Sequence, residues 1–442
     1  MNSWIKAIFI ISGVFCALAL GALGWLAVQT TDVPDARSAK PLPAWEKPLR
    51  AARGTASTGR ATLPDIAVVP DLAAQVDELT KRLLEIGTAG GAVPGELLLS
   101  FKSPEALGAF RARAGLAGIE ILQSDPRLLS ARVRYRDAEA MARELRDHAR
   151  DYDNIGLNYL AWVPGLPQTP TETDTTNAGG RQPFGNSGLE AIGATGDRST
   201  WGRGVTVAVL DTGVTDHSTL KQTQVTHVDL VKDGQAPNGH GTAMASLIAG
   251  NDSENGGVAI ASKLLDIRVA DASGESNTGL VAQGIMQAVD QGARVINISL
   301  GTTGDSAVLR RAVEYAQSRG VVIVAAAGNE QQTTLAYPAS YEGVISVGAA
   351  DATDAQAYFS NSGENLTLVA PGVGIVSGYS DDRMVISSGT SQATAITSGV
   401  VSTLISRGWS AAGVEQALTS NARETGAPAN QVGAGILQVP TR

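Results

Sequence analysis

The chain has 442 residues, of which 43% are hydrophobic and 17% charged, and its formal net charge is −9. This length allows two or three domains. The acidic balance argues against nucleic-acid binding, because no basic stripe is available to neutralise phosphates. The single cysteine, Cys16, excludes intrachain disulfides, so an exported part of this chain must be stable without oxidative folding.

The N-terminal segment is strongly apolar. Residues 7–28 contain no charged residue, Lys6 precedes them, and Asp32 and Asp35 follow. A run of this length suits a bilayer span with its N-terminus in the cytoplasm and the rest of the chain outside. We therefore expect residues 1–30 to be a retained transmembrane signal anchor. A cleavable signal peptide is the alternative.

Residues 31–94 form a predicted spacer. From about Pro34 to Pro70 the composition is rich in Pro, Ala, Lys, Arg and Thr and lacks apolar periodicity. Over residues 71–86 apolar residues then recur at alternating spacings of four and three, which predicts a short amphipathic helix. Its apolar stripe consists of Leu72, Val76, Leu79, Leu83 and Ile86.

Residues 95–165 show alternating strand and helix signals in the order βαββαβ, which predicts a small α+β, ferredoxin-like unit with two helices on one face of its sheet. The expected strands are 96–102, 119–123, 128–135 and 154–163, and the expected helices are 103–115 and 137–151. By itself the unit has the character of a binding or folding module. Residues 166–187 are rich in Thr, Pro, Gly and Asn and predict an exposed linker that is open to proteolysis.

The remainder, residues 188–442, has the pattern of a long α/β domain. Near-continuous apolar strands alternate with helices, which predicts a mostly parallel sheet covered on both faces. The expected strands are 205–210, 263–269, 294–300, 321–327 and 343–348, and the clearest helices between them are 278–291 and 305–319. In such sheets, functional residues gather where the strands end.

Three polar residues fit that expectation. Asp211 closes the first strand, His240 precedes an apolar helix, and Ser391 opens the last large helix. Serine, histidine and aspartate together supply the nucleophile, the base and the orienting carboxylate of acyl transfer. Each residue alone is more simply a cap or a turn residue. Their occurrence together favours the catalytic interpretation.

The surrounding motifs resemble those of the subtilisin-like (subtilase) serine proteases, over roughly residues 184–439. Residues 207–214 resemble the aspartate motif of that family, residues 238–245 its histidine motif and residues 389–393 its serine motif. The resemblance implies a serine endopeptidase that hydrolyses extended polypeptides through an acyl-enzyme and requires no cofactor. His240 would deprotonate Ser391 while Asp211 orients His240.

The resemblance also implies roles for other residues. Asn329 would supply a side-chain donor to the oxyanion, beside the backbone N–H of Ser391. A substrate would pair as an added strand with residues 299–301. The implied substrate-binding residues are Ser299, Leu300, Gly301, Ala326, Gly328 and Ala336.

Subtilases are commonly made with a prodomain of βαββαβ topology, so the resemblance implies that residues 95–165 help the catalytic domain to fold and then occupy its active site. We expect self-cleavage between about Pro164 and Gly188. The expected partners are therefore a polypeptide substrate, the chain's own prodomain and, through residues 1–30, a membrane. The catalytic domain would lie outside the cytoplasm, either anchored or secreted after cleavage.

Two details depart from the family pattern or leave alternatives open. Gln392 stands where an apolar residue usually follows the nucleophile. Calcium is frequent in the family, and residues 251–255 offer oxygen ligands, but the same run is equally an ordinary solvated turn.

His217 and His227 are interpreted as structural, because no second cluster of Cys or carboxylates completes a metal site.

Two rival functions fit parts of the sequence. A lipase or esterase of the α/β-hydrolase kind requires Gly-x-Ser-x-Gly and the chain order Ser, Asp, His, whereas here the order is Asp, His, Ser and Ala393 ends the motif. A catalytically silent envelope protein that only binds peptides is the second rival. Such a binder has no need of Asn329 or His240.

Overall fold

The structure is a computed structural model that describes residue 83 and residues 91–164, 182–252 and 256–441. All of these belong to one compact unit, Thr55–Arg442. The predicted span of residues 7–28 and nearly all of the predicted helix 71–86 lie outside the described residues. Within the described ranges, no helix has the length and apolar character needed to cross a bilayer. The anchor therefore stays a prediction.

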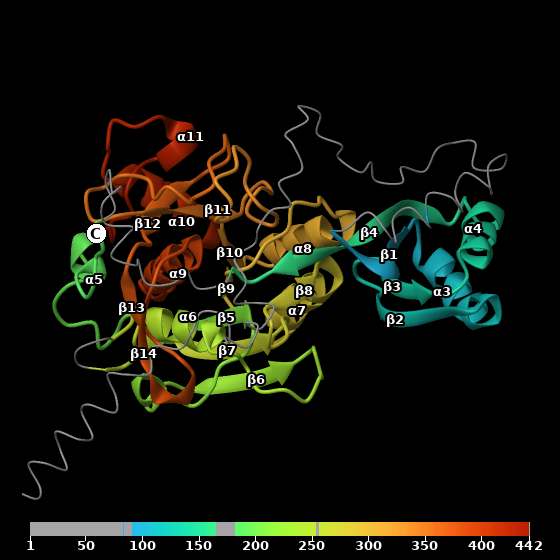
Figure 1. The fold of residues 1–442 in the computed structure, drawn as a ribbon, viewed down its shortest axis with the longest axis horizontal. Coiled ribbons are helices and arrows are strands. Elements are labelled where there is room, and N and C mark those ends of the chain that lie inside the picture. Colours follow the sequence, from blue (N-terminus) through green and yellow to red (C-terminus); the bar gives the residue numbers. More distant parts are fainter. Residues whose placement is uncertain (1–82, 84–90, 165–181, 253–255, 442) are drawn as a thin grey trace, which may run out of the picture. The chain divides into compact units, whose positions relative to one another are not determined.

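A sheet of seven strands, with every neighbouring pair parallel, forms the centre of the larger domain (Figure 1). The strand order is β12-β11-β10-β9-β5-β7-β6. Five of these strands coincide with the predicted ones, whereas the two edge strands, β6 and β12, were not predicted. The strands are β5 (Thr206–Asp211), β6 (Val225–Asp229), β7 (Lys263–Arg268), β9 (Val295–Ile298), β10 (Val322–Ala326), β11 (Ile345–Ala350) and β12 (Leu368–Pro371).

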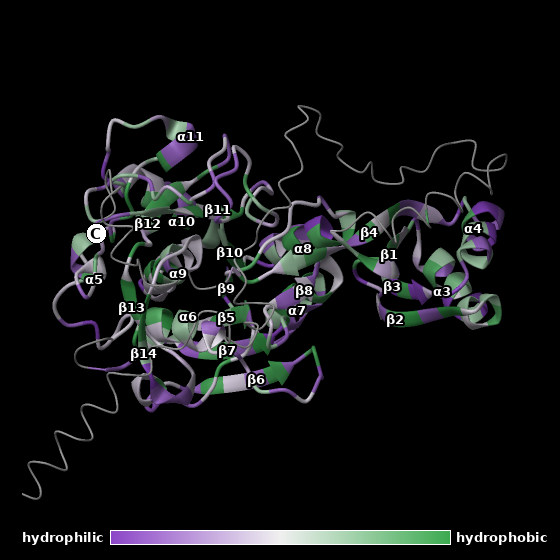
Figure 2. Cartoon of the chain, viewed as in Figure 1, coloured by the Kyte–Doolittle hydropathy of each residue, from purple (hydrophilic) through white to green (hydrophobic). Residues whose placement is uncertain are grey.

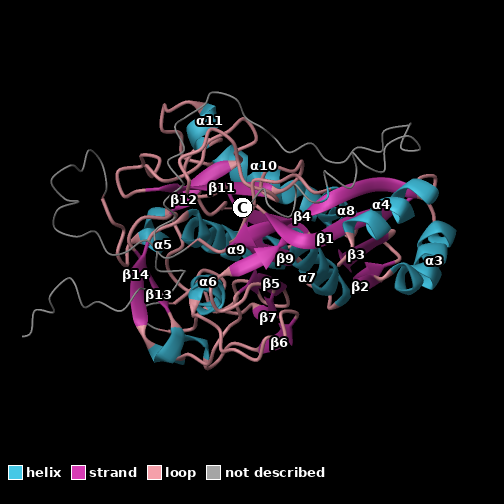
Figure 3. Cartoon of the chain, turned by 45° about the vertical axis from the view of Figure 1, so that its right-hand side comes forward, coloured by secondary structure: helices cyan, strands magenta, loops and turns pink. Residues whose placement is uncertain are grey.

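Helices cover both faces of this sheet, as the sequence predicts. Along β5, Val207 and Val209 belong to the core cluster that contains α6 (His240–Ala249) and α9 (Thr390–Ser406). Ala208 and Leu210 belong to the opposite cluster, which contains α7 (Thr278–Asp290) and α8 (Ala307–Ser318). Figures 1 and 3 show α7 and α8 side by side, and Figure 2 shows both hydrophobic and polar residues along α8.

The helices on the two faces begin differently. On one face, the Asn277 side chain accepts a hydrogen bond from Leu280 N and caps α7. On the other face, α6 and α9 have glycine N-caps, Gly239 and Gly389, which make no side-chain capping bond. The N-cap residues of α6 and α9 therefore leave the first backbone N–H groups of both helices to other partners.

The smaller region has the βαββαβ element order predicted for residues 95–165. Its helices, α3 (Pro104–Arg113) and α4 (Ala138–Asp147), share one core with the sheet. The rings of Phe101 and Tyr152 lie 5.3 Å apart in that core. The sheet order is β2-β3-β1-β4-β8, where β8 (Glu275–Asn277) comes from the larger domain. The other strands are β1 (Ala92–Phe101), β2 (Ile119–Asp125), β3 (Ser130–Tyr135) and β4 (Tyr152–Trp162).

Shorter elements complete the larger domain. A two-stranded antiparallel hairpin, β13 and β14, leads directly into α9. The C-terminal helices are α10 and α11, and the short helix α5 opens the domain. The bounds of these elements are α5 (Gly188–Ala191), β13 (Ile375–Gly378), β14 (Met384–Ser387), α10 (Ala411–Asn421) and α11 (Ala429–Val432).

A buried carboxylate connects three strands of the smaller sheet. The Glu96 side chain is 1% exposed and accepts hydrogen bonds from Arg132, Arg134 and Asn158, each of 2.8 Å. Burial raises the pKa of the Glu96 carboxyl, but the hydrogen bonds and charges of these partners lower it by more, so the net pKa lies below its usual value. The ionised form of Glu96 therefore stabilises the folded region.

The first prediction concerns this carboxylate. Because its folded pKa is lowered, its stabilisation is present above the unfolded pKa, near 4.5, and is lost as the pH falls through the folded pKa. In a Ser391→Ala background, which prevents the expected self-cleavage, Glu96→Gln should lower the stability at pH 7 by about 1–3 kcal/mol. The melting-temperature difference from the parent should shrink toward pH 3. Glu120→Gln, an exposed carboxylate on the same sheet, is the control, and equal effects of the two changes would contradict the interpretation.

Candidate active site

The four residues expected to carry the chemistry come from separate elements and gather at the carboxyl edge of the large sheet. Asp211 is the last residue of β5, and Asn329 follows β10. His240 is the first residue of α6, and Ser391 is the second residue of α9. Each is thus held at the end of a strand or at the start of a helix.

The aspartate and the histidine form a buried pair. Asp211 is 0% and His240 is 2% exposed, and His240 Nδ1 lies 2.8 Å from Asp211 Oδ1 and 2.9 Å from Oδ2. The backbone N–H of Thr212 donates a third hydrogen bond to Asp211 Oδ1, at 2.7 Å. Because the carboxylate accepts only, Nδ1 must carry a proton, and in the neutral ring Nε2 is left as the basic nitrogen.

A glycine allows helix α6 to approach the aspartate closely. A Cβ atom on Gly241 would lie 2.5 Å from the Gly213 carbonyl oxygen and 3.2 Å from Asp211 Cβ. Asn238 holds the start of α6 beside the end of β5. Its Oδ1 accepts hydrogen bonds from His240 N and from the Thr212 hydroxyl, each 3.0 Å long. The position of His240 therefore depends on backbone contacts that leave no room for a side chain at position 241.

The serine is buried and its hydroxyl is engaged by the backbone. Ser391 is 1% exposed, and its Oγ donates to the Ser299 carbonyl oxygen at 3.2 Å. Within the described part of the chain, no hydrogen bond joins Ser391 Oγ to the His240 ring. Hydrogen bonds between a nucleophile and its base are often long without substrate and tighten in the complex, so this geometry is compatible with proton transfer.

The asparagine is fixed by its neighbour on α9. Asn329 Oδ1 accepts hydrogen bonds from Thr390 N at 3.0 Å and from Thr390 Oγ1 at 2.8 Å, which leaves Nδ2 facing the other way. A Cβ atom on Gly389 would lie 3.2 Å from Asn329 Nδ2 and 3.7 Å from Ser391 N. The two donors thus converge on one small space beside the serine. Thr390, which sets this orientation, was not singled out from the sequence.

The expected substrate-binding residues lie around the same edge. Gly301 exchanges two backbone hydrogen bonds with Trp162, of 2.9 and 3.1 Å, and a Cβ atom on Gly301 would come within 2.8 Å of Ala336 Cβ. Ala326 ends β10 and Gly328 immediately precedes Asn329. The side chain of Leu300 is buried in the core, so only its backbone is available for the predicted contact.

A second buried carboxylate, near Asp211, was not predicted from the sequence. Asp266, in β7, is 4% exposed, and its Oδ2 accepts Val214 N at 3.0 Å and contacts His227 Nδ1 at 2.9 Å. Burial raises the pKa of Asp266, and the hydrogen bond to Asp266 raises the pKa of His227. Asp266 lies within an apolar strand sequence and carries no local motif, so only the sheet register, which places it opposite Val209 and His227, could reveal it.

The described residues test only part of the predictions about histidine and metal. His217 is buried and contacts Thr219 Oγ1 at 2.9 Å and the Arg383 carbonyl oxygen at 3.0 Å, which fits a structural role. The residues that the structure describes include no group of three His, Cys, Asp or Glu side chains arranged to hold a metal. Residues 253–255 of the candidate calcium loop lie outside them, so calcium and an ordinary solvated turn both stay open there.

A parallel α/β sheet whose edge brings a serine, a buried aspartate–histidine pair and two convergent N–H donors together has the arrangement of a serine hydrolase. The model of the subtilase family, Peptidase_S8, matches residues 202–435, which is more than half of the chain. The chain therefore belongs to the subtilase family and is a subtilisin-like serine protease.

Individual relatives agree with this assignment. The chain is 35% identical over 286 residues to an alkaline protease of Shouchella clausii, covering 64% of this chain and 75% of the relative. It is 37% identical over 260 residues to subtilisin Savinase of Lederbergia lenta, covering 58% and 96%. It is also 39% identical over 228 residues to thermitase of Thermoactinomyces vulgaris, covering 50% and 82%.

Among solved structures, the chain is similar in fold to fervidolysin from Fervidobacterium pennivorans, which is described as a keratinolytic enzyme related to subtilisin. The TM-score is 0.67 at 23% sequence identity, and the match covers 79% of this chain and 61% of that one. At this identity the likeness supports the fold only.

The second prediction tests the close approach of α6. In the Ser391→Ala background, Gly241→Ala should lower the stability by about 1–3 kcal/mol, because the added methyl group overlaps the backbone at Gly213. The matched control is Gly108→Ala in α3, where a Cβ atom meets nothing within 4 Å. That control should be neutral or stabilising. Thermal unfolding of both variants is the measurement, and indistinguishable melting temperatures would count against the interpretation.

Proposed function

We propose that this protease is an endopeptidase of extended polypeptides, made as a zymogen that cleaves itself, with Ser391 as nucleophile, His240 as base and Asp211 as the orienting carboxylate. The observation that carries the proposal is the course of the chain at the end of β4. There the chain's own backbone lies extended against Gly301, two residues from Ser299, whose carbonyl oxygen accepts the Ser391 hydroxyl. Export through residues 1–30 is part of the proposal and rests on the sequence alone.

The chemistry follows the geometry of the site. His240 Nε2 takes the proton of Ser391 Oγ as that oxygen bonds to the peptide carbonyl carbon, and Asp211 stabilises the resulting imidazolium. The carbonyl oxygen becomes an oxyanion that accepts hydrogen bonds from Asn329 Nδ2 and Ser391 N. His240 then gives its proton to the departing amine, and water hydrolyses the acyl-enzyme by the same steps in reverse order.

The register of the chain's own strand indicates where the first cut falls. Trp162 pairs with Gly301 in antiparallel fashion, and Val163 N donates to the Gly274 carbonyl oxygen at 2.9 Å. Two residues further along, an antiparallel ladder brings Pro164 opposite Ser299. The Ser299 carbonyl oxygen accepts a hydrogen bond from the Ser391 hydroxyl, so a residue opposite Ser299 lies beside the nucleophile. The Pro164 carbonyl is therefore the group proposed to be attacked. Within the predicted range of residues 164–188, the first cut is therefore proposed at the bond that follows Pro164.

Backbone and polar contacts support an inhibitory role for the region of residues 92–162. Asn158 Oδ1 accepts a hydrogen bond from Gly279 N at 2.9 Å and so caps the first turn of α7. Strand β4 adds to β8 through residues 160–162, in the manner of a bound peptide strand. A strand held in this way excludes a substrate from the same edge.

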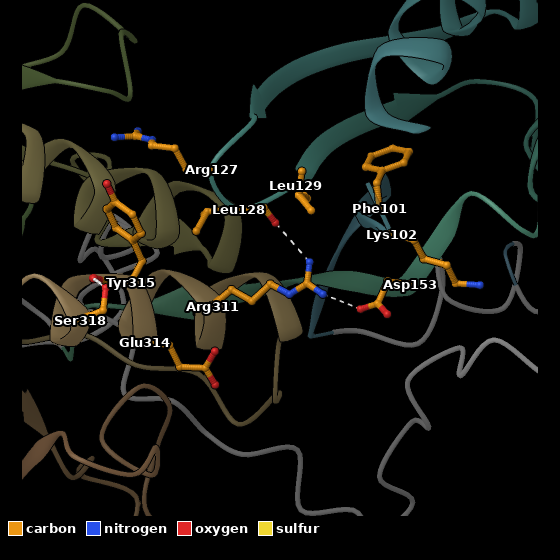
Figure 4. Close-up of a pocket in the computed structure, with 10 residues that line it drawn as sticks. All are labelled: Phe101, Lys102, Arg127, Leu128, Leu129, Asp153, Arg311, Glu314, Tyr315 and Ser318. Carbon is orange, nitrogen blue, oxygen red and sulfur yellow. Dashed lines mark hydrogen bonds and ion pairs between the residues drawn. The ribbon is translucent and has the colours of Figure 1, made fainter. Parts of the chain in front are cut away.

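Ion pairs add to these contacts on the side of α8. Arg311 donates to the Leu128 carbonyl oxygen at 3.1 Å and forms an ion pair with Asp153 (Figure 4). Arg127 forms a second ion pair, with Asp290 of α7. Both pairs are partly exposed, so salt should screen them.

The third prediction tests self-cleavage by Ser391. Intact mass and N-terminal sequencing of the purified full-length chain should show a cut after Pro164, whereas the Ser391→Ala chain should stay whole at that bond. A fluorophosphonate should label Ser391 in the processed protein.

Asp211→Asn should lower kcat by about 10⁴, because the imidazole loses its required tautomer. If the wild-type and Ser391→Ala chains both stay whole and neither cleaves a denatured protein, the proposal fails and a peptide-binding protein is favoured.

The fourth prediction concerns retention of the cleaved region. Replacing Arg127 and Arg311 together by Ala should raise the dissociation constant of residues 92–162 from the processed enzyme by about 2- to 30-fold at low salt, as expected for two exposed pairs. The difference should shrink at 1 M salt. Arg143→Ala, which breaks an exposed ion pair with Glu139 within α4, is the matched control. Recovery of peptidase activity on dilution is the measurement, and equal behaviour of the two variants would refute the role of these pairs.

A further inference from the structure

The residue after the nucleophile has an unusual environment. Gln392 is the third residue of α9 and is 1% exposed. One end of its side-chain amide contacts Ser387 Oγ at 2.7 Å. The other end is buried and, with the oxygen placed there, has no hydrogen-bond partner among the described residues. A buried acceptor without a partner is costly and calls for an explanation.

The two ends of a glutamine amide have nearly the same shape, so the hydrogen-bond network must decide which end faces which partner. The Ser387 hydroxyl can donate or accept equally well. With the amide turned by 180°, Oε1 accepts the Ser387 hydroxyl proton, and the group left without a partner is an N–H donor, which an oxygen atom of a bound substrate can satisfy. The Nε2 group then occupies the inner end of the side chain.

That inner end lies beside the two oxyanion donors. A Cβ atom on Gly389 would be 2.7 Å from the inner amide atom, 3.2 Å from Asn329 Nδ2 and 3.7 Å from Ser391 N. Three polar atoms therefore surround one small space that is open only because residue 389 has no side chain. In the turned orientation all three are N–H donors.

We propose that Gln392 Nε2 is a third hydrogen-bond donor to the oxyanion formed on the substrate carbonyl. The inference rests on the proposed function and assigns a catalytic contact to a residue outside the triad. As Ser391 Oγ bonds to the carbonyl carbon, the π electron pair moves to the carbonyl oxygen, and that oxygen accepts N–H bonds from Asn329, Ser391 and Gln392. Gln392 itself gains and loses no proton.

The opposite orientation makes the opposite prediction. An amide oxygen aimed at this space would repel the developing negative charge, so its removal would raise the rate of the reaction. An apolar side chain of similar length neither donates nor repels. Replacement of Gln392 by Met therefore distinguishes the two orientations by the direction of the change in kcat.

The fifth prediction is that Gln392→Met lowers kcat by about 10-fold or more and leaves KM within about 2-fold, because the oxyanion exists only in the transition state. The full-length chain is allowed to process itself, its active sites are titrated with a fluorophosphonate, and a peptide p-nitroanilide is then turned over. The affinity for a peptide aldehyde, which forms a tetrahedral adduct with the serine, should fall in parallel with kcat.

Two further variants keep the test decisive. Ser387→Ala removes the hydroxyl that orients the amide and should give a smaller loss of kcat in the same direction, even if Gln392→Met fails to fold. Thr397→Val is the matched control in the same buried helix, because the Thr397 hydroxyl donates only to the Ala393 carbonyl oxygen. It should leave kcat unchanged.

The outcomes separate the two levels of the proposal. An active wild type whose Gln392→Met variant has an equal or higher kcat, with unchanged affinity for the aldehyde, overturns the third donor and leaves the protease mechanism intact. An unchanged kcat in the Ser387→Ala variant would likewise contradict the third donor. A wild-type protein that cleaves neither itself nor any peptide overturns both the proposed function and the third donor.

Discussion

The packing of α6 and α9 on one face of the parallel sheet, with their first turns at its carboxyl edge, is the constraint on which the rest of the structure depends. In a parallel sheet all strands end at the same edge, so residues far apart in the chain are brought together there. Asp211 arrives on a central strand, and His240 and Ser391 arrive on the first turns of two helices that share one core cluster. Because both helices begin at glycine, their first turns come close to the strand ends.

Burial determines the electrostatics of this edge. The Asp211–His240 pair is almost wholly removed from solvent, where charge–dipole interactions are stronger than in water. Its hydrogen bonds to backbone and side-chain donors compensate for that burial. Asp266 adds a second buried carboxylate nearby and is balanced by the partly exposed His227. The site thus contains a second buried carboxylate–histidine contact that the motifs alone do not reveal.

The region of residues 92–162 follows the same physical logic on a smaller scale. Its sheet encloses the ionised Glu96, and Asn158 connects that carboxylate to the first turn of α7. The last strand then passes from one sheet to the next, since β4 pairs with both β1 and β8. The extended backbone that completes the small sheet therefore also occupies the edge proposed for substrate. Folding and inhibition would depend on one strand.

Local sequence patterns were enough to predict the class of the fold, the five apolar central strands, the principal helices, and the places of Asp211, His240 and Ser391 at a strand end and two helix starts, because hydrophobic periodicity and short motifs are local properties of the chain. Edge strands β6 and β12 escaped prediction, since their residues are too few or too polar to form a distinct apolar run. Tertiary structure alone decided the contact of Asp266 with His227, the pairing of Trp162 with Gly301, and the position of the Gln392 amide beside Asn329. Each depends on residues distant in sequence, whose register and packing no local pattern specifies.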